Sequence, residues 1–379
     1  MTERAYPAAR AVAGPVEAHF ARHLTDARRQ GLDGLAPEPD AVTIEAMIDA
    51  AFWASLRREE DHLPIISLVY LPPDQAGQPL RFERTLPLAP RALTRLAPAV
   101  ERPGIHLGVW HFEGELRVWG TTRSIPRYCF VLEVVEPGLL VVKHRRGDEY
   151  KKFANVAVLE GDEVKIVDEA GASLPDCPSL VSSLLGFHSS VMDDESVNIL
   201  VQLAVSMRAH RRGGSLLVVP HGNAVWRDSI VHPIPYPVVP PYEELAKLMR
   251  HEPGFDAARG WQEAVRRAVD AIAGLTAVDG AAVISDQYDL LAFGAKIGRA
   301  DGSMPVEKLM LTEPVVGSAA REIHPTQMGG TRHLSAAQFI HDQPDALALV
   351  ASQGGRFTVF AWSPCEGMVH AHRVEALLL

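Results

Sequence analysis

Two segments near the start of the chain place apolar residues at the spacing of an α-helix. Residues 43–57 carry apolar side chains three and four positions apart, namely Ile44, Met47, Ile48, Ala51 and Phe52. Residues 15–30 form a second candidate helix, with Pro15 in the first turn, where proline is tolerated, and Gly31 just after the end. We therefore expect two helices before residue 58.

The pattern changes between residues 64 and 168, where short apolar runs alternate with turn residues. The run 65–71 predicts one strand, and three longer segments predict β-hairpins. The hairpins cover residues 105–120, 129–144 and 153–168 and turn at 113–114, 137–138 and 161–162. This pattern predicts an α+β domain with an antiparallel sheet, and we find no catalytic constellation in it.

A segment poor in charge separates the two halves of the chain. Residues 170–192 carry one Asp among Ser, Pro and Gly residues, a composition typical of a linker. Beyond it we expect helices at 193–210, 243–250 and 260–275 and a buried strand at 215–220. The prolines of residues 230–242 exclude a central strand there. The predicted domains are residues 1–189 and residues 190–379.

Composition and charge narrow the classes of function. The chain has 379 residues, 47% of them hydrophobic, which suffices for two packed domains. The first 189 residues hold 21 basic and 26 acidic residues and the last 190 hold 16 and 21, so neither half is a basic platform. We therefore do not expect long DNA as a partner, although a few local groups would still suffice to hold a small anion.

The cysteines and the N-terminus indicate the compartment. Cys129, Cys177 and Cys365 are widely spaced and odd in number, so they form neither a disulfide framework nor a zinc ribbon. The first twenty residues lack the apolar core of a signal peptide, and no apolar run is long enough to span a bilayer. We expect a cytoplasmic protein with no membrane span.

Two polar groups in the first half carry weaker signals. His19 and His23 are four residues apart and would share one face of a helix, as two metal ligands can. We interpret them as solvent-facing, because no carboxylate or third ligand is evident nearby. The basic residues 143–146, with Lys151 and Lys152, are interpreted as a solvated loop rather than an anion site.

Residues 277–298 form the first of two segments with candidate chemistry. They read as a strand around 282–284, a turn at 286–289 and a second strand at 290–297. Asp279 comes where the chain enters the buried strand, so we expect it to need a partner such as a metal or a hydroxyl. Gly280 and Ala281 leave room for a flat ligand against the backbone. An ordinary turn Asp is the simpler interpretation of this segment alone.

Residues 329–362 form the second segment. Gly329 and Gly330 precede a predicted helix at 332–340, which Thr331 can cap, and free N–H groups at a helix start bind anions. Thr331 and Ser335 add hydroxyls, while Arg332 and His333 add charge and donors. A buried strand at 346–352 ends in Ser352 and is followed by a turn and a strand at 356–362. Taken alone, this is a capped helix with a modest phosphate signal.

Together the two segments resemble the diadenylate cyclase domain, known from DNA-integrity-scanning and membrane-linked cyclases that make cyclic di-AMP. The matching residues are Asp279-Gly280-Ala281, Gly330-Thr331-Arg332-His333 and Ser352-Gln353, in the family's order and strand context. The resemblance spans roughly residues 195–379 and implies a mixed sheet flanked by helices. The first half resembles, more vaguely, the sensor-type domains that are fused ahead of such cyclases.

The resemblance implies a nucleotidyltransferase that condenses two ATP molecules into cyclic di-AMP with release of pyrophosphate. Asp279 would bind Mg²⁺ or Mn²⁺, and Thr331, Arg332, His333 and Ser335 would hold the triphosphate. Gly280, Ala281 and the backbone near Ile297 would border the adenine, and Gly330, Ser352 and Gln353 would line the rest. One domain supplies half of the reaction centre, so a face-to-face homodimer is the smallest active unit, and an unknown ligand would act on the sensor domain.

Two departures from the family pattern keep alternatives open. Leu334 stands where the family usually has Arg, which removes a phosphate contact, and residues 299–329 form a longer segment than usual that would lid the site or obstruct dimerisation. The alternatives are a weak or inactive nucleotide-binding signalling module and a cyclase that uses another nucleotide.

Overall fold

The structure, a computed structural model, describes residues 5–58, 62–145, 153–168, 199–250 and 258–379. The chain divides into two compact units, Met1–Val167 with Leu379 and Asp168–Leu378, and each is described by itself. The predicted linker, 170–192, and the predicted boundary at 189 lie outside the described residues. Both units combine helices with a mixed sheet, which confirms the α+β class.

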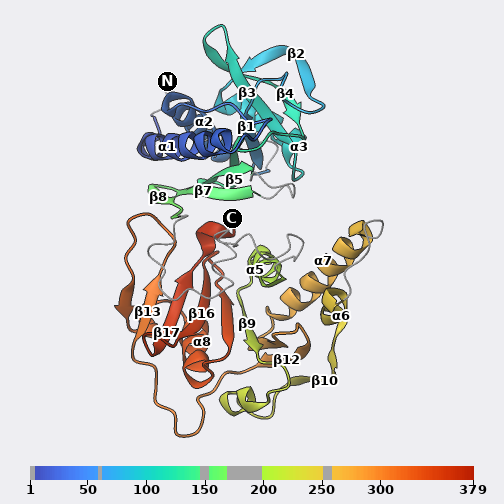
Figure 1. The fold of residues 1–379 in the computed structure, drawn as a ribbon, viewed down its shortest axis with the longest axis vertical. Coiled ribbons are helices and arrows are strands. Elements are labelled where there is room, and N and C mark those ends of the chain that lie inside the picture. Colours follow the sequence, from blue (N-terminus) through green and yellow to red (C-terminus); the bar gives the residue numbers. More distant parts are fainter. Residues whose placement is uncertain (1–4, 59–61, 146–152, 169–198, 251–257) are drawn as a thin grey trace. The chain divides into compact units, whose positions relative to one another are not determined.

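The first unit is built on an eight-stranded sheet with the order β2-β4-β3-β1-β5-β6-β7-β8 (Figure 1). Its strands are β1 Ile66–Tyr70, β2 Leu80–Pro87, β3 His106–Phe112, β4 Glu115–Thr122, β5 Phe130–Glu136, β6 Leu139–Arg145, β7 Phe153–Glu160 and β8 Glu163–Ile166. The three predicted hairpins are confirmed as β3–β4, β5–β6 and β7–β8. The sheet is not wholly antiparallel, because β1 runs parallel to β3.

Three helices, α1 Pro7–Arg29, α2 Ala41–Ser55 and α3 Pro90–Val100, share one apolar core with this sheet. Helix α1 begins eight residues before the predicted start and contains Pro15. A buried stripe that runs from Val12 through Val16 and Phe20 to Leu24 explains this, because tertiary packing outweighs the local cost of the proline. Asp40 caps α2 by accepting a hydrogen bond from the Thr43 N–H at 2.7 Å.

The sequence pattern missed β2 and α3. Most residues of β2 are exposed, so the strand lacks the alternation of buried and exposed side chains that marks a strand with one buried face. Helix α3 carries Pro90 at its start and Pro98 inside, and two prolines in eleven residues point away from a helix. Both elements are held by pairing and packing with residues distant in sequence.

The second unit is built on a nine-stranded sheet with the order β10-β12-β11-β9-β15-β16-β17-β13-β14 (Figure 1). Its strands are β9 Gly214–Val219, β10 Tyr236–Tyr242, β11 Ala281–Ser285, β12 Leu290–Ala295, β13 Leu309–Thr312, β14 Arg321–Ile323, β15 Leu347–Ala351, β16 Phe357–Ser363 and β17 Met368–Arg373. The proline-rich β10 lies at the edge of the sheet. This agrees with the prediction that its prolines exclude a central strand.

Helices cover both faces of this second sheet. Helices α5 Ile199–Ala209, α6 Glu244–Arg250 and α7 Ala258–Leu275 contribute to the core on one face, and α8 Thr331–Asp342 packs on the other. Central strands β9, β11 and β15 are buried on both faces, which explains their continuous apolar runs. No helix in the described part of the chain is long and apolar enough to cross a membrane.

The chain packs tightly around Gly214, at the start of β9. A Cβ on this residue would lie 2.7 Å from the carbonyl oxygen of Thr276, which follows α7, so Gly214→Ala forces backbone to move. We expect Gly214→Ala to lower the free energy of unfolding by about 1–3 kcal/mol. Gly274→Ala is the control, because a Cβ there meets nothing within 4 Å, and a helical alanine should be neutral or stabilising by up to about 1 kcal/mol. Equal midpoints for the two variants in thermal unfolding would contradict this packing.

Candidate functional site

The register of three central strands brings the two motif segments to one edge of the second sheet. Strand β9 pairs in parallel with β11, with Leu216 opposite Ala282, and antiparallel with β15, with Gly214 opposite Ala351. The residues before β9 and β11 and the residues after β15 therefore lie side by side. We call this edge, with residues 279–281, 213 and 352–356, the motif edge. Since neighbouring strands are about 4.8 Å apart, β11 and β15 are roughly 10 Å apart.

Helix α8 begins at the motif edge and packs on the sheet face that includes Leu217, Val283 and Val350. Nη1 of Arg332, in its first turn, lies 3.2 Å from where a Cβ on Gly213 would be, and Cγ of Gln353 lies 3.4 Å from that point. Gly213 also has a φ of +69°, in the left-handed region. The structure thus brings Arg332 and Gln353 together over a glycine, although 20 residues separate them in sequence.

The start of α8 differs from the prediction in one detail. Gly330 is the N-cap and makes no side-chain cap hydrogen bond, while Thr331 is the first helical residue, so the prediction that Thr331 caps the helix is wrong. Thr331 is exposed and Ser335, one turn later, is half-buried. The first N–H groups of this 12-residue helix point to its N-terminal end, where the helix dipole also favours an anion.

His333 is buried against the sheet with 7% of its surface exposed. Burial, followed by the charges of Arg373, Arg356 and Arg332, lowers the pKa of His333 to about 4. The imidazole is therefore neutral at pH 7, and the expectation that it adds positive charge is wrong. It offers a hydrogen-bond donor and acceptor instead.

Three arginines thus surround this neutral imidazole, and two of them were missed from sequence. Arg356 precedes β16 and Arg373 ends β17, and Thr358 of β16 pairs with both Arg373 and Val350 of β15. These pairings place both arginines at the motif edge. No local motif marks them, because only the strand order reveals that they lie at the same edge as Arg332. The cluster gives the edge the charge and the fork-shaped donors that suit a polyphosphate.

Ser352 organises the turn that carries Arg356. Its Oγ accepts a hydrogen bond from the Arg356 N–H at 3.0 Å, and its own N–H donates to the Arg356 carbonyl at 2.9 Å. Ser352 is half-buried and Gln353 is exposed. The hydroxyl hydrogen of Ser352 remains a donor for a ligand, and the same residue fixes the place of an arginine.

Asp279 lies at the motif edge on the other side of β9. Its side chain is 88% exposed and one oxygen lies 3.6 Å from Nζ of Lys296. From the sequence, we expect this carboxylate to be buried and therefore to need a partner. That expectation is wrong, because the carboxylate is exposed and water solvates it. Its exposed oxygens fit a divalent ion, since Mg²⁺ is often held by one or two carboxylates together with substrate phosphates.

Gly280 has the backbone conformation that only glycine adopts easily. Its φ is +106°, and a Cβ would lie 2.4 Å from the carbonyl carbon of Gly294 on β12. The missing side chain therefore makes room for β12, and the expectation that it makes room for a flat ligand is wrong. Ala281 is buried and pairs with Ala295, and Ile297, just beyond β12, is half-buried and bridges to Ile230. The motif residues therefore form two groups along one edge, one around Asp279 and one around Arg332.

The long segment 299–329 does not form one loop. Strands β13 and β14 extend the sheet beyond β17. The stretch before them is anchored at the C-terminal end of α8, where the buried Asp342 accepts hydrogen bonds from the Ala300 N–H at 2.9 Å and from the Ser303 hydroxyl. That end is about 16 Å from the helix start, so this stretch does not cover the motif edge.

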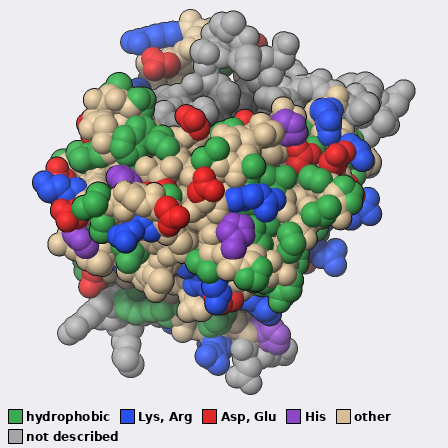
Figure 2. Space-filling view, turned by 90° about the horizontal axis from the view of Figure 1, so that it is seen from below, with side chains coloured by type: hydrophobic (Ala, Val, Ile, Leu, Met, Phe, Trp, Pro, Cys, Tyr) green, Lys and Arg blue, Asp and Glu red, His purple; other side chains and the backbone are tan. Residues whose placement is uncertain are grey.

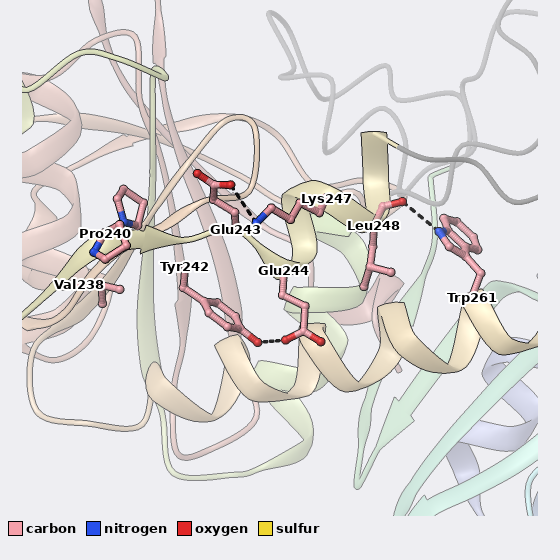
Figure 3. A pocket seen from close by; sticks show the side chains of 9 residues that line it. Val238, Pro240, Tyr242, Glu243, Glu244, Lys247, Leu248 and Trp261 are labelled. Carbon is pink, nitrogen blue, oxygen red and sulfur yellow. Dashed lines mark hydrogen bonds and ion pairs between the residues drawn. The ribbon is translucent and has the colours of Figure 1, made fainter.

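Two hollows of the second unit lie away from the motif residues. One of about 760 Å³ lies between β10, α6 and α7 and is lined by Tyr242, Lys247, Leu248 and Trp261 among others (Figure 3). The other, of about 190 Å³, lies at the opposite end of β9, beside Trp226 and Asp342. On the face shown in Figure 2, Lys and Arg side chains are scattered among Asp and Glu rather than gathered into a platform.

Comparison with protein families identifies part of the first unit. Residues 33–123 match the family described as "Probable sensor domain DACNV". The matched segment contains α2, α3 and strands β1 to β4, so the first unit includes a sensor-type domain, as the resemblance of the first half predicts. The curated proteins contain no match to the chain.

The unusual pKa of His333 is directly measurable. We expect its imidazole to titrate near pH 4 in NMR spectra of the labelled chain, and Arg373→Gln to raise that pKa, because a neighbouring positive charge is removed. An unfolded histidine takes up its proton near pH 6.5, so His333 should make the protein less stable as the pH falls from about 6.5 to about 4. A pKa near 6.5 in the folded protein would contradict the buried cationic surroundings.

Proposed function

We propose that the second unit is a nucleotidyltransferase of the diadenylate cyclase type, which joins two ATP molecules into cyclic di-AMP and is regulated through the sensor-type domain of the first unit. One observation carries the proposal. The register of β11, β9 and β15 collects the motif segments, which the sequence separates by about fifty and twenty residues, at one sheet edge with three arginines and an uncapped helix start.

The group around Arg332 is suited to the triphosphate. The N–H groups at the start of α8 and the guanidinium groups of Arg332, Arg356 and Arg373 offer charge-assisted hydrogen bonds to phosphate oxygens. Thr331, Ser335, Ser352 and Gln353 add neutral polar groups around them. The imidazole of His333 is neutral among these cations, so it does not add to their mutual repulsion. It can still donate or accept a hydrogen bond with the substrate.

The group around Asp279 would bind the metal ion and the adenine of ATP. Asp279 would hold Mg²⁺ or Mn²⁺ together with phosphate oxygens, and the bound ion would supply charge stabilisation and lower the pKa of the attacking hydroxyl. Gly280 brings backbone close to β12, and the adenine would lie beside Gly280, Ala281 and Ile297, as the resemblance implies. Lys296 lies within ion-pair distance of Asp279 and would balance its charge when no ion is bound.

The reaction requires two copies of the unit facing each other. The 3′-oxygen of each ATP attacks the α-phosphorus of the other, a new P–O bond forms, and the bond to pyrophosphate breaks. Each hydroxyl proton passes to solvent or to a base. Positioning and charge stabilisation supply most of the rate in such transfers. A site that a second copy completes needs residues exposed at the surface, as Asp279 and Thr331 are.

Asp279→Ala tests the proposed role of the carboxylate. We expect the variant to fold normally, because Asp279 is exposed, and to lose cyclic di-AMP formation by at least roughly 100-fold, because the metal loses its protein ligand. The assay incubates full-length protein with ATP and Mg²⁺ or Mn²⁺ and measures product by mass spectrometry. Asp301→Ala, an exposed aspartate in the segment 299–329, is the matched control and should keep full activity.

An undiminished rate in Asp279→Ala would exclude the role assigned to this residue. Tight ATP binding by the wild-type chain without product under either metal would instead favour a nucleotide-binding signalling module. Product from GTP but not from ATP would favour a cyclase with another base.

Leu334 stands where the family usually has an Arg that contacts a phosphate. Leu334→Arg tests whether restoring this contact strengthens ATP binding. Leu334 lies in the first turn of α8 with 39% of its surface exposed, so an arginine fits there without repacking the core. One additional charged hydrogen bond is worth about 1.5–3 kcal/mol, so we expect ATP to bind at least roughly ten times more tightly. Leu334→Met is the control without charge. Equal ATP affinities of the two variants in calorimetry would contradict a triphosphate at this helix start.

A further inference from the structure

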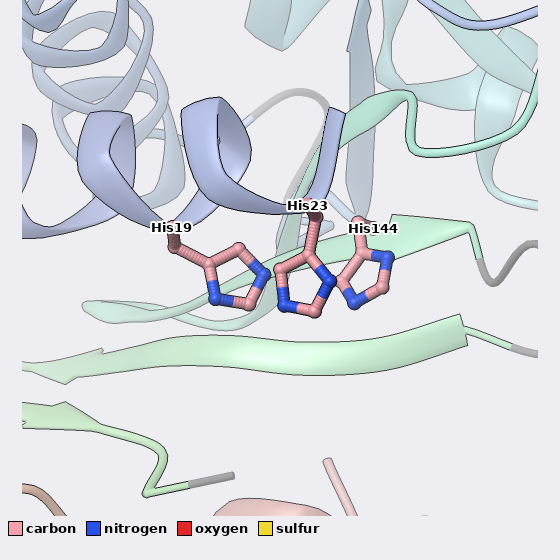
Figure 4. Close-up of side chains that lie close together, drawn as sticks. All are labelled: His19, His23 and His144. Atoms are coloured by element: carbon pink, nitrogen blue, oxygen red, sulfur yellow. The ribbon is translucent and has the colours of Figure 1, made fainter. Parts of the chain in front are cut away.

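The first unit brings three histidines together from two distant segments (Figure 4). His19 and His23 lie one turn apart on α1, and His144 lies on β6. One ring nitrogen of each residue lies within 4.8 Å of the corresponding atoms of the other two. The interpretation of His19 and His23 as solvent-facing is therefore wrong for His19, which is 8% exposed, and the third ligand that the sequence seemed to lack is His144, which is 4% exposed.

The spacing of the rings is close to that of three imidazoles around one metal ion. With metal–nitrogen bonds of about 2.0–2.1 Å, tetrahedral ligand nitrogens lie about 3.4 Å apart and the ring centres roughly 5 Å apart. The observed centroid distances are 4.4 Å between His19 and His23, 5.2 Å between His19 and His144 and 5.3 Å between His23 and His144. Small side-chain rotations would therefore complete the geometry.

The surroundings hold these rings in place. The ring of Tyr128 stacks on His144 at 5.5 Å and on His23 at 5.8 Å, and Phe20 contacts both His19 and His144 edge-on. Imidazole nitrogens are the usual ligands of Zn²⁺ and its first-row neighbours.

We propose that His19, His23 and His144 bind one divalent first-row transition-metal ion. Three protein nitrogens leave a fourth position open to water or to a small ligand, as in zinc sites that bind exchangeable groups. The ion would add a link between α1 and β6 to the apolar core that these two elements share. The site lies outside the matched segment 33–123 but within the same compact unit.

Metal binding by the full-length, untagged chain tests this site. After treatment with a chelator and dialysis, Zn²⁺ is titrated in by calorimetry and the bound metal is counted by mass spectrometry, while Co²⁺ serves as a spectroscopic probe of tetrahedral geometry. We expect one ion per chain with a submicromolar dissociation constant and a higher unfolding temperature in the presence of metal. His23→Gln and His144→Gln should weaken binding by roughly 100-fold or more.

His111→Gln is the matched control, because His111 is an exposed histidine of the same unit outside the cluster, and it should leave binding unchanged. If His144→Gln fails to fold by circular dichroism, His23→Gln decides, since His23 is only half-buried. Failure of the wild-type chain to retain one ion, or undiminished binding by His23→Gln, would overturn the proposal. The assay contains no ATP, so its outcome is independent of the proposed cyclase activity.

Discussion

The pairing of β9 with β11 on one side and β15 on the other is the constraint on which the candidate site depends. Because β9 and β11 are parallel while β15 runs against them, the entry of two strands and the exit of the third fall on the same edge. Helix α8 packs across this sheet and begins at that edge. A register slip of one residue in β15 would turn Val350 from the α8 face to the other and move Ser352 away from Gly213.

The residues at the motif edge provide charged groups and close packing. Arg332, Arg356 and Arg373 supply positive charge, whereas burial keeps His333 neutral among them. Gly213 and Gly280 allow close packing, because a side chain at either position would meet neighbouring protein atoms within 3.4 Å. Asp279 supplies an exposed carboxylate close to Lys296. The positive charge at this edge suits a ligand that carries several negative charges.

Local patterns in the sequence predicted the hairpins, the central strands and the motif residues, because each depends on neighbouring residues. They did not predict β2, α3 or the start of α1, where packing with distant residues decides the conformation. The same reason explains what was missed at the sites. Arg356 and Arg373 join Arg332 only through the strand order, and His144 joins His19 and His23 only through the fold of the first unit.

A crystal structure of the full-length chain with 3′-deoxy-ATP and Mn²⁺ would show whether the motif edge binds nucleotide, because this nucleotide lacks the attacking hydroxyl and cannot react. We expect the triphosphate between the start of α8 and the turn 352–356, with the metal against Asp279 and the adenine beside Ala281. Nucleotide bound in the hollow between β10 and α7, or electron density for nucleotide nowhere on the second unit at saturating concentration, would contradict this expectation.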